Sequence, residues 1–401
     1  MRRAWILPVL LLASDGRAEE PVPAAPVPRL LGARVGPERA AALQRYGGTV
    51  ETEKAVAAGL DWLLRHQGQD GLWDADGFAS RCTAGGPVCE GKGKGQHGED
   101  QPCPFDEAIS ALALLAFLGA GHLPGTPGAE GAALEQALTR LARTGDVWTL
   151  PLVTEALAEA EALGGKGRWR SALEANVKRL VLARQPDGAW GYAAPWRAGS
   201  DVPYTALVVP ALLAARDVGV AVPPDLGPGV ETWLTTLEEE KGKLAYLLEG
   251  RAYGYTPTTS NAHAAFALRE LLETGTRSPR HAAHAALVAG EAPAWKISFR
   301  EVEVPGRGRL RVQVGHLSLY AWWYGTLGSF QKGGAAWTRW QGALKSALLP
   351  HQRKDGCARG SWDPEGTYER QTGGRVFATA LAVLMLEQPY RHRRLAGEPG
   401  R

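Results

Sequence analysis

The stretch Gln67-Gly-Gln-Asp-Gly-Leu-Trp73 lies between two apolar segments, each long enough to form a helix. The same pattern returns as Gln185-Pro-Asp-Gly-Ala-Trp190, and in a stretched form as Gln352-Arg-Lys-Asp-Gly356 with Trp362 further along. A loop signature that recurs between helices indicates a repeated helical hairpin, and such a repeat decides the architecture. We predict structural roles for the residues that define the three copies: Gln67, Gly71 and Trp73; Gln185, Gly188 and Trp190; Gln352, Gly356 and Trp362.

The composition is that of an ordinary soluble globular chain. Of 401 residues, 45% are apolar and 22% are charged. The net charge of +3 is small for a chain with 45 basic and 42 acidic residues, and the basic residues are spread along the sequence. A basic patch of the kind that binds nucleic acid is therefore not expected.

The N-terminus has the pattern of an export signal. Arg2 and Arg3 precede a short apolar core at 6–13, and small residues then lead to an acidic pair at 19–20. We predict a signal peptide over 1–18, a leader or linker over 19–48, and a periplasmic, cell-envelope or extracellular location. No later run reaches the roughly 18 apolar residues that a membrane-spanning helix needs, so no span is expected after cleavage.

Apolar periodicity predicts helices in pairs, and the two members of a pair differ in character. The first member is amphipathic, as in 51–66, while the second is apolar nearly all round, as in 105–118. An apolar helix is expected to be buried on every side, so the second helices form an inner ring and the first helices wrap around it. We predict six hairpins in an all-α (α/α)6 toroid over 49–390, followed by a basic tail at 391–401. The outer helices are expected near 51–66, 129–144, 169–184, 227–248, 278–290 and 336–351, and the inner helices near 105–118, 149–163, 205–215, 259–274, 316–331 and 376–386.

Two local features depart from this pattern. Residues 296–315 alternate between apolar and polar, with a Pro-Gly turn at 305–306, which predicts a small β-hairpin insertion. Pro210 lies inside the third inner helix and predicts a kink or a short break there.

Taken together, these loops resemble the tryptophan repeats of the squalene–hopene cyclase and protein prenyltransferase superfamily, over roughly residues 50–390. In that superfamily the glutamine caps helix ends and the tryptophan stacks beneath, so the resemblance implies the toroid fold rather than a reaction. The segment 188–206 is similar to the stretch of the cyclases that leads to their acidic motif, with Asp201, Thr205 and Ala206 in matching positions. Pro203 occupies the position of the proton-donating aspartate of that motif, and Tyr204 follows it.

These differences argue against both reactions of the superfamily. A proline carries no proton to donate, and a tyrosine with a pKa near 10 is too weak an acid to replace a carboxylic acid. The resemblance to the prenyltransferases would imply a zinc ion held by an Asp-x-Cys pair and a distant histidine. Asp355-Gly-Cys357 matches the Asp-x-Cys pair, but it lies in a repeat loop. The only histidine that follows it is His392. We therefore predict neither a metal site nor a cofactor.

The starts of the inner helices are expected to line the mouth of the barrel. This places Asp201, Tyr204, His263, His316 and Asp106 there as candidate catalytic residues. Carboxylates at helix starts are also favoured as caps and by the helix dipole, and histidines beside buried helices commonly only form hydrogen bonds. Candidate ligand-binding residues at the mouth are Phe105, Tyr204, Tyr320, Trp322, Trp323 and Arg375. Since Trp322 and Trp323 are adjacent on a helix, at most one of them can face the axis.

The four cysteines are distributed unevenly: Cys82, Cys89 and Cys103 lie in the long insertion 74–104, and Cys357 lies in the last repeat loop. In a closed ring the first and last hairpins are neighbours, so we predict a disulfide from Cys357 to one of the other three cysteines, with Cys103 as the first choice, that holds the ring shut. A local Cys82–Cys89 or Cys82–Cys103 bridge with Cys357 as a buried thiol is the alternative.

Three classes of function stay open at this point. The leading hypothesis is an exported, non-catalytic toroid whose central cavity and rim loops bind an apolar small molecule or another protein. The alternatives are a divergent isoprenoid cyclase or prenyltransferase, and a glycan-active (α/α)6 enzyme. Whether the chain is an enzyme is left undecided, because one fold of this kind supports unrelated functions.

Overall fold

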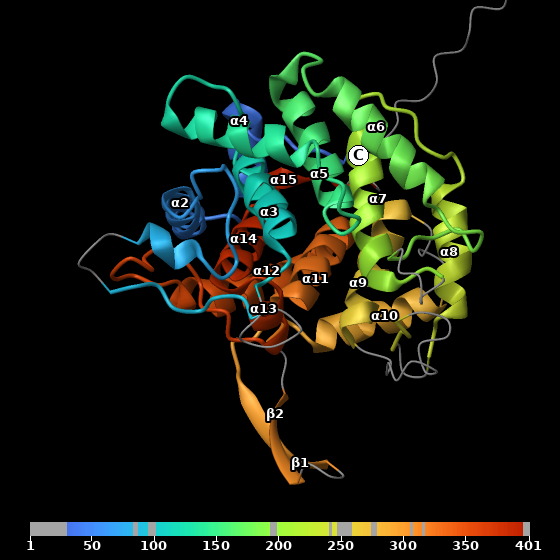
Figure 1. Cartoon of the computed structure of the whole chain (residues 1–401). Coiled ribbons are helices and arrows are strands. Elements are labelled where there is room, and N and C mark those ends of the chain that lie inside the picture. Colours follow the sequence, from blue (N-terminus) through green and yellow to red (C-terminus); the bar gives the residue numbers. More distant parts are fainter. Residues whose placement is uncertain are drawn as a thin grey trace, which may run out of the picture.

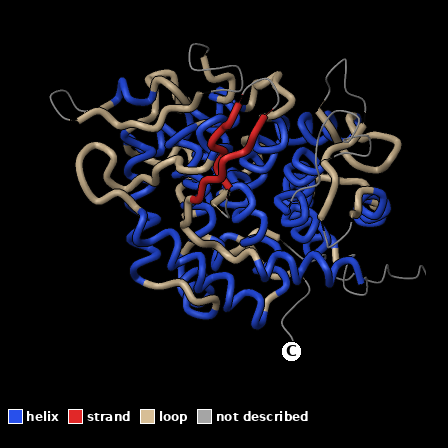
Figure 2. Tube along the Cα trace, turned by 90° about the horizontal axis from the view of Figure 1, so that it is seen from below, coloured by secondary structure: helices blue, strands red, loops and turns tan. Residues whose placement is uncertain are grey.

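The computed structural model describes residues 30–82, 87–94, 102–192, 199–239, 243–246, 259–273, 279–304, 308–314 and 317–395. The predicted signal peptide, residues 19–29 of the predicted leader, and His316 lie outside these residues. Helices surround a common centre, and a single pair of strands projects from one end (Figure 1). Figure 2 views the molecule from the end that carries the strands.

Six apolar helices form a closed inner ring. Each of them packs against the next, and the last, α14, packs against the first, α3, so the described helices confirm the predicted (α/α)6 toroid. The inner helices are α3 (Asp106–Gly119), α5 (Leu150–Ala160), α7 (Val202–Asp217), α9 (Thr259–Leu272), α11 (Leu319–Lys332) and α14 (Gly374–Leu386). The outer helices are α2 (Val50–Arg65), α4 (Ala129–Leu141), α6 (Arg170–Leu182), α8 (Leu226–Thr236), α10 (Pro279–Gly290) and α12 (Gly334–Leu348).

Side chains fill the axis of the ring. Every residue of α5 and of α14 is buried, on the side that faces the axis as well as on the sides that face neighbours. An open channel would leave the axial side chains exposed to solvent. The apolar character that predicted an inner helix therefore also closes the centre of the barrel over the length of these helices.

The repeat loops fasten each outer helix to its inner partner. Trp73, Trp190 and Trp362 are fully buried, and each indole Nε1 donates to a carbonyl near the end of the preceding outer helix, at 2.6–2.8 Å. The backbone N–H of each tryptophan donates to a hydroxyl on the inner helix that follows. Buried polar groups of the loop are thereby satisfied by both helices of the hairpin. The three hydroxyls belong to Ser110, Thr205 and Thr379.

Two of the repeat glutamines connect one hairpin to the next. Gln67 donates to the carbonyl of Ala133 in the second outer helix, at 3.1 Å. Gln352 of the sixth hairpin donates to the carbonyl of Ala55 in the first outer helix, at 2.8 Å. This bond spans almost the whole chain and closes the ring. Gln185 bonds only within its own loop, to the carbonyl of Ala183.

The end of the ring opposite to the strands is closed by the two ends of the described chain. Helix α15 (Gln388–Arg391) packs against α1 (Gly36–Arg45), and Leu31 forms a bridge with His392. Arg391 and Arg34 are buried and both pair with Glu159, at 2.7 and 2.6 Å. Buried charges of this kind are stable only in pairs. Part of the predicted leader is therefore helical, and the first residues of the predicted basic tail belong to the core.

The predicted β-hairpin is present and precedes α11. Strands β1 (Ser298–Val304) and β2 (Gly308–Val314) pair antiparallel, with Ser298 opposite Val314, and extend away from the helices (Figure 1). The break expected at Pro210 is absent, since α7 runs through this residue. Short elements complete the described chain: η1 (Phe78–Arg81), η2 (Glu161–Gly165), η5 (Leu349–His351) and α13 (Thr367–Thr372). None of the described helices combines the length and the apolar character that crossing a bilayer requires.

The repeat-loop hydroxyls provide a test of this architecture. Thr205 accepts from the N–H of Trp190 at 3.0 Å and donates to its carbonyl at 2.9 Å, in a fully buried site. Thr205→Val keeps the shape but leaves the N–H of Trp190 without a partner, while its carbonyl still accepts from the N–H of Asp201 at 2.8 Å. We expect this change to cost about 1–3 kcal/mol of stability. Calorimetry should show a lower midpoint of thermal unfolding. Thr235→Val, at an exposed threonine of α8, is the control, and an equal loss in both variants would contradict this role of the loops.

Candidate functional site

The starts of the inner helices gather at the end of the ring that carries the strands. Phe105, just before α3, contacts Trp148, just before α5, and the Tyr204 hydroxyl of α7 donates to the carbonyl of Val147 at 2.9 Å. Cys103 donates to the carbonyl of Thr372 beside α14. This end is the mouth that the sequence predicts, and it brings residues from distant hairpins together.

One group of aromatic rings lines the mouth from the first three inner helices. Trp148 stacks on Tyr192 with ring centroids 3.5 Å apart, and Tyr192 contacts Tyr204 at 4.8 Å. Trp148 keeps 36% of its surface exposed, whereas Tyr192 and Tyr204 are buried beneath it. Offset and tilted ring pairs of this kind add stability beyond their buried area.

A second group of rings comes from the last two inner helices. Tyr320 contacts Tyr324 at 4.9 Å and Tyr368 at 5.0 Å, and Tyr368 contacts Phe377 at 6.0 Å. Burial raises the pKa of Tyr192 above its ordinary value, and Asp201, Tyr320 and Tyr368 contribute to this rise. The two groups therefore lie near each other at the mouth. We call them the aromatic floor: Phe105, Trp148, Tyr192, Tyr204, Tyr320, Tyr324, Tyr368 and Phe377.

The two tryptophans predicted to bind ligand do not share one surface. Trp322 is buried and contacts Trp295, which stacks on His351 beside the outer helix α12, so its ring faces the outer layer. Trp323 is half-buried and contacts Tyr324 of the aromatic floor. Only Trp323 therefore lies next to the mouth residues.

Asp201 and Tyr204 serve the local structure. Asp201 caps α7 by accepting from the N–H of Tyr204 at 2.9 Å, and it also accepts from the N–H of Tyr192 at 3.2 Å. An N-cap carboxylate satisfies a backbone donor that the helix leaves without a partner. Burial raises the pKa of Tyr204 above its ordinary value, so its hydroxyl stays protonated and donates to Val147.

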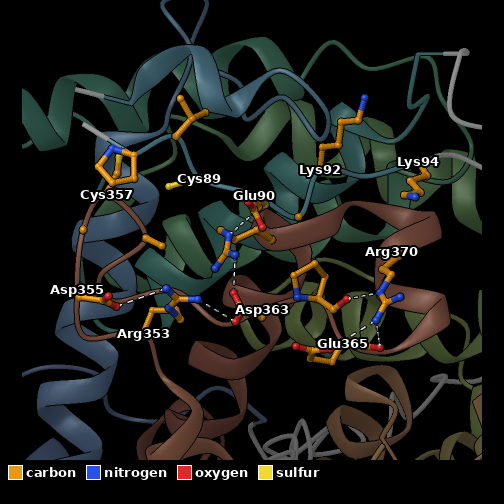
Figure 3. Close-up of a pocket in the computed structure, with 17 residues that line it drawn as sticks. Cys89, Glu90, Lys92, Lys94, Arg353, Asp355, Cys357, Asp363, Glu365 and Arg370 are labelled. Carbon is orange, nitrogen blue, oxygen red and sulfur yellow. Dashed lines mark hydrogen bonds and ion pairs between the residues drawn. The ribbon is translucent and has the colours of Figure 1, made fainter. Parts of the chain in front are cut away.

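His263 and Arg375 are also held in structural contacts. His263 is buried against Trp340 of an outer helix, its Nδ1 lies 2.8 Å from the carbonyl of Thr259, and burial lowers its pKa. Arg375 is buried at the start of α14 and pairs with Asp363. Its guanidinium also donates to the Glu90 carbonyl at 2.6 Å and to Ser361 at 2.8 Å, which fixes the insertion 87–94 against the last repeat loop (Figure 3).

Asp106 lies in a separate polar cavity beside the first repeat loop. This cavity has a volume of about 710 Å³, and Asp74, Glu107 and Arg140 are among its lining residues. Asp106 accepts from the N–H of Ala75 at 2.8 Å. Burial and the neighbouring carboxylates together raise the pKa of Asp106 to about 6, although that hydrogen bond lowers it. A pKa in this range suits acid–base chemistry near neutral pH.

A cluster that the sequence did not predict lies where the first and last hairpins meet. His66 Nε2 is 3.7 Å from Cys82 Sγ, 3.6 Å from Cys89 Sγ and 3.3 Å from Cys357 Sγ. All four donor atoms lie within 4.8 Å of one another, which is the arrangement of a metal-ligand set. We call these four residues the Cys3His cluster. Cys89 and Cys357 form one end of a neighbouring cavity of about 510 Å³ (Figure 3).

The predicted Cys103–Cys357 disulfide is not formed. All four cysteines are unbridged in the structure. Cys103 donates to the carbonyl of Thr372, and Cys357 instead approaches Cys82, Cys89 and His66. The prediction identified the correct pair of loops but the wrong cysteine, because the fold of the insertion turns Cys103 toward α13.

His66 was not predicted as a site residue, because its sequence context is that of an ordinary residue at the end of a helix. It directly precedes Gln67 of the first repeat and ends α2, where a histidine is unremarkable. The useful indication was indirect. In a closed ring the loop after α12 approaches α2, so polar residues at the end of α2 should have been considered together with Cys357.

Comparison with known proteins supports the fold alone. No protein-family model matches the chain, and no curated protein matches it significantly. Solved structures do match over most of the chain, at identities that establish architecture and not activity. An unsaturated glucuronyl hydrolase specific for heparin shares 12% identity over 84% of this chain and 96% of its own, with a TM-score of 0.55. The GH76A α-1,6-mannanase from Salegentibacter sp. HEL1_6 shares 11% over 84% and 98%, with a TM-score of 0.53.

A type II terpene cyclase, MstE from Scytonema, shares 13% identity over 84% of this chain and 98% of its own, with a TM-score of 0.48. The class that the fold defines is thus the (α/α)6 toroid. The resemblance to squalene–hopene cyclases and prenyltransferases holds at this level of architecture and does not extend to that superfamily in particular.

The raised pKa of Asp106 gives a pH-dependent prediction. A carboxyl group whose pKa rises from 3.8 to about 6 on folding destabilises the folded state progressively between these values and fully above about 6. Asp106→Asn keeps an acceptor for Ala75 and cannot ionise. We expect it to stabilise the protein by about 1–2 kcal/mol above pH 6, after allowance for partial solvent exposure, and to have no effect near pH 3.5.

Urea unfolding followed between pH 3.5 and 8 would measure this difference. Asp355→Asn is the matched control, because this side chain is 81% exposed. A stability difference for Asp106→Asn that does not depend on pH would show that the carboxyl group has an ordinary pKa.

Proposed function

We propose that the chain is a non-catalytic, exported toroid that binds a small molecule on the aromatic floor. The observation that carries this proposal is the convergence at the mouth of rings from three inner helices, α7, α11 and α14, and from segments that precede inner helices. Trp148 and Tyr368 stay 36% and 40% exposed there, although large aromatic side chains in a fold of this size are mostly buried.

The polar groups at the mouth support binding rather than catalysis. Asp201 is held by two backbone N–H groups, Tyr204 donates to a carbonyl, and His263 faces the outer layer. None of these residues pairs with another in the way that a nucleophile and its base would. Since side chains also fill the barrel axis, a ligand would lie on the floor and would not enter a deep channel.

The floor is best suited to a ligand with an apolar ring face and polar edges. Exposed aromatic rings stack on such faces, as they do on sugar rings and on phenols. The hydroxyls of Tyr320 and Tyr324 are buried and lie within hydrogen-bonding reach of each other, so a ligand on the floor would contact the exposed rings of Trp148 and Tyr368.

Hydrolysis of a glycan at the cavity of Asp106 is a second candidate function. It is favoured by the pKa of about 6 for Asp106, with Glu107 in the same cavity, since glycosidases use a pair of carboxyl groups of which one has a raised pKa. Glu107 is engaged by the hydroxyl of Thr144 and Asp106 by a backbone N–H, which makes this candidate weaker. A cyclase reaction has less support, because Asp201 is an N-cap.

Binding would be tested by titration of intrinsic tryptophan fluorescence and by native mass spectrometry of the full chain. A suitable panel contains α-1,6-linked mannose oligosaccharides, heparin-derived oligosaccharides and geranylgeranyl-substituted phenols. We expect one class to bind, and Trp148→Ala and Tyr368→Ala each to weaken its binding about 10-fold or more, as removal of a stacking ring costs roughly 1–3 kcal/mol.

Val35→Ala, at an exposed apolar residue near the closed end of the ring, is the control and should bind as the unmodified protein does. Product formation from the oligosaccharides that is abolished by Asp106→Asn would replace the binding proposal by the glycosidase. Binding that survives both aromatic substitutions would exclude the aromatic floor as the site.

A further inference from the structure

We propose that the Cys3His cluster is a structural zinc site that joins the first hairpin of the ring to the last. His66 ends the first outer helix, Cys82 and Cys89 lie in the insertion that follows, and Cys357 lies 291 residues from His66 in the last repeat loop. This inference is independent of what the aromatic floor binds.

The three nitrogen–sulfur distances of the cluster match those of a tetrahedral zinc centre. Bonds of about 2.3 Å to sulfur and 2.0–2.1 Å to nitrogen, at tetrahedral angles, place a sulfur and a nitrogen about 3.5 Å apart. The separations from His66 Nε2 to the three sulfur atoms are 3.7, 3.6 and 3.3 Å. Four donor atoms from four parts of the chain therefore converge on one point at zinc-binding separations.

The orientation of His66 is fixed by contacts outside the cluster. Its Nδ1 lies 2.8 Å from the carbonyl of Trp62, which selects the tautomer with the proton on Nδ1 and directs the lone pair of Nε2 toward the cysteines. Its ring also stacks on Trp62 at 4.3 Å. A second hydrogen bond of this kind is typical of histidines that ligate a metal ion.

The loops that carry the cysteines are also held in place. The N–H of Cys89 lies 3.2 Å from Cys82 Sγ, and Arg65 donates to the carbonyls of Cys357 and Arg359. Arg65 precedes His66, so the end of α2 positions two parts of the cluster at once. Cation side chains close to a site with three thiolates offset its net negative charge.

Binding of zinc to this arrangement would change the protonation of the thiols. Zinc binds the thiolate form, and each cysteine that becomes a ligand releases its proton to solvent. A fully ligated site therefore releases up to three protons, and its affinity for zinc falls as the pH is lowered.

The ligand set indicates a structural and not a catalytic role. Three thiolates and one imidazole fill all four tetrahedral positions, whereas a catalytic zinc ion keeps one position for water or substrate. Thiolate sulfur also selects zinc over magnesium or calcium. The predicted disulfide would have joined the same two hairpins, so the metal ion performs the closure that the sequence attributed to a covalent bridge.

The first test is the metal content of the full-length protein, purified without chelator and measured by plasma mass spectrometry. We expect about one zinc ion per chain, as for structural sites with four protein ligands. Replacement of zinc by Co²⁺ should give the absorption bands of a tetrahedral thiolate site in the unmodified fold. Purified protein without zinc that also fails to bind Zn²⁺ or Co²⁺ under reducing conditions would overturn the proposal.

The zinc content of cysteine variants tests which residues form the site. Cys357→Ser should lose most of the bound zinc, whereas Cys103→Ser, at a cysteine outside the cluster, should retain it. If Cys357→Ser fails to fold, hydrogen exchange of the unmodified protein decides: chelation should increase exchange at the end of α2 and at 353–363 and leave α5 and α6 unchanged. A Cys82–Cys89 disulfide in peptides from the non-reduced protein, or equal zinc loss in both variants, would refute the site.

Discussion

The contact between the sixth hairpin and the first is the constraint on which the rest of the structure depends. Five of the neighbour contacts in the ring join hairpins that follow each other in sequence, and only this one joins residues separated by nearly the whole chain. Helix α14 packs against α2 and α3, and Gln352 donates to the carbonyl of Ala55. Without this contact the inner helices would form an open superhelix, and their apolar end faces would be exposed to water. The burial of α14 on all sides therefore requires the closed ring.

Most of the architecture could be predicted because it follows from local patterns. A helix that is apolar all round, such as α3, can only be an inner helix, and the alternation at 298–304 can only be a strand. The alternation of amphipathic and apolar helices predicted the number of hairpins, and three repeat loops supported it. The groups that could not be predicted depend on partners that are distant in sequence. Arg391 belongs to a buried ion network with Glu159, and His66 meets Cys357, yet each residue alone resembles an ordinary surface or helix-end residue.

The candidate catalytic residues illustrate a related difficulty. Residue types that perform acid–base chemistry are also those that terminate helices, because a carboxylate at a helix start satisfies backbone N–H groups. Asp201 and Asp106 both accept such bonds, but Asp106 also lies in a cavity among other carboxylates, where burial and these like charges raise its pKa to about 6. Sequence spacing places both residues at the mouth and cannot distinguish them. The distinction depends on local solvation, which the folded structure alone determines.

The insertion 87–94 at the rim of the ring is connected by hydrogen bonds to two helices that carry part of the aromatic floor. Glu90, adjacent to Cys89, accepts from Arg375 at the start of α14, and Lys94 donates to the carbonyl of Arg370 in α13. Helices α13 and α14 carry Tyr368 and Phe377 of the floor. The insertion that supplies two of the cysteines is thus hydrogen-bonded to the helices that supply two of the floor rings. The same insertion therefore contributes to the Cys3His cluster at Cys89 and is held against the mouth by hydrogen bonds at Glu90 and Lys94.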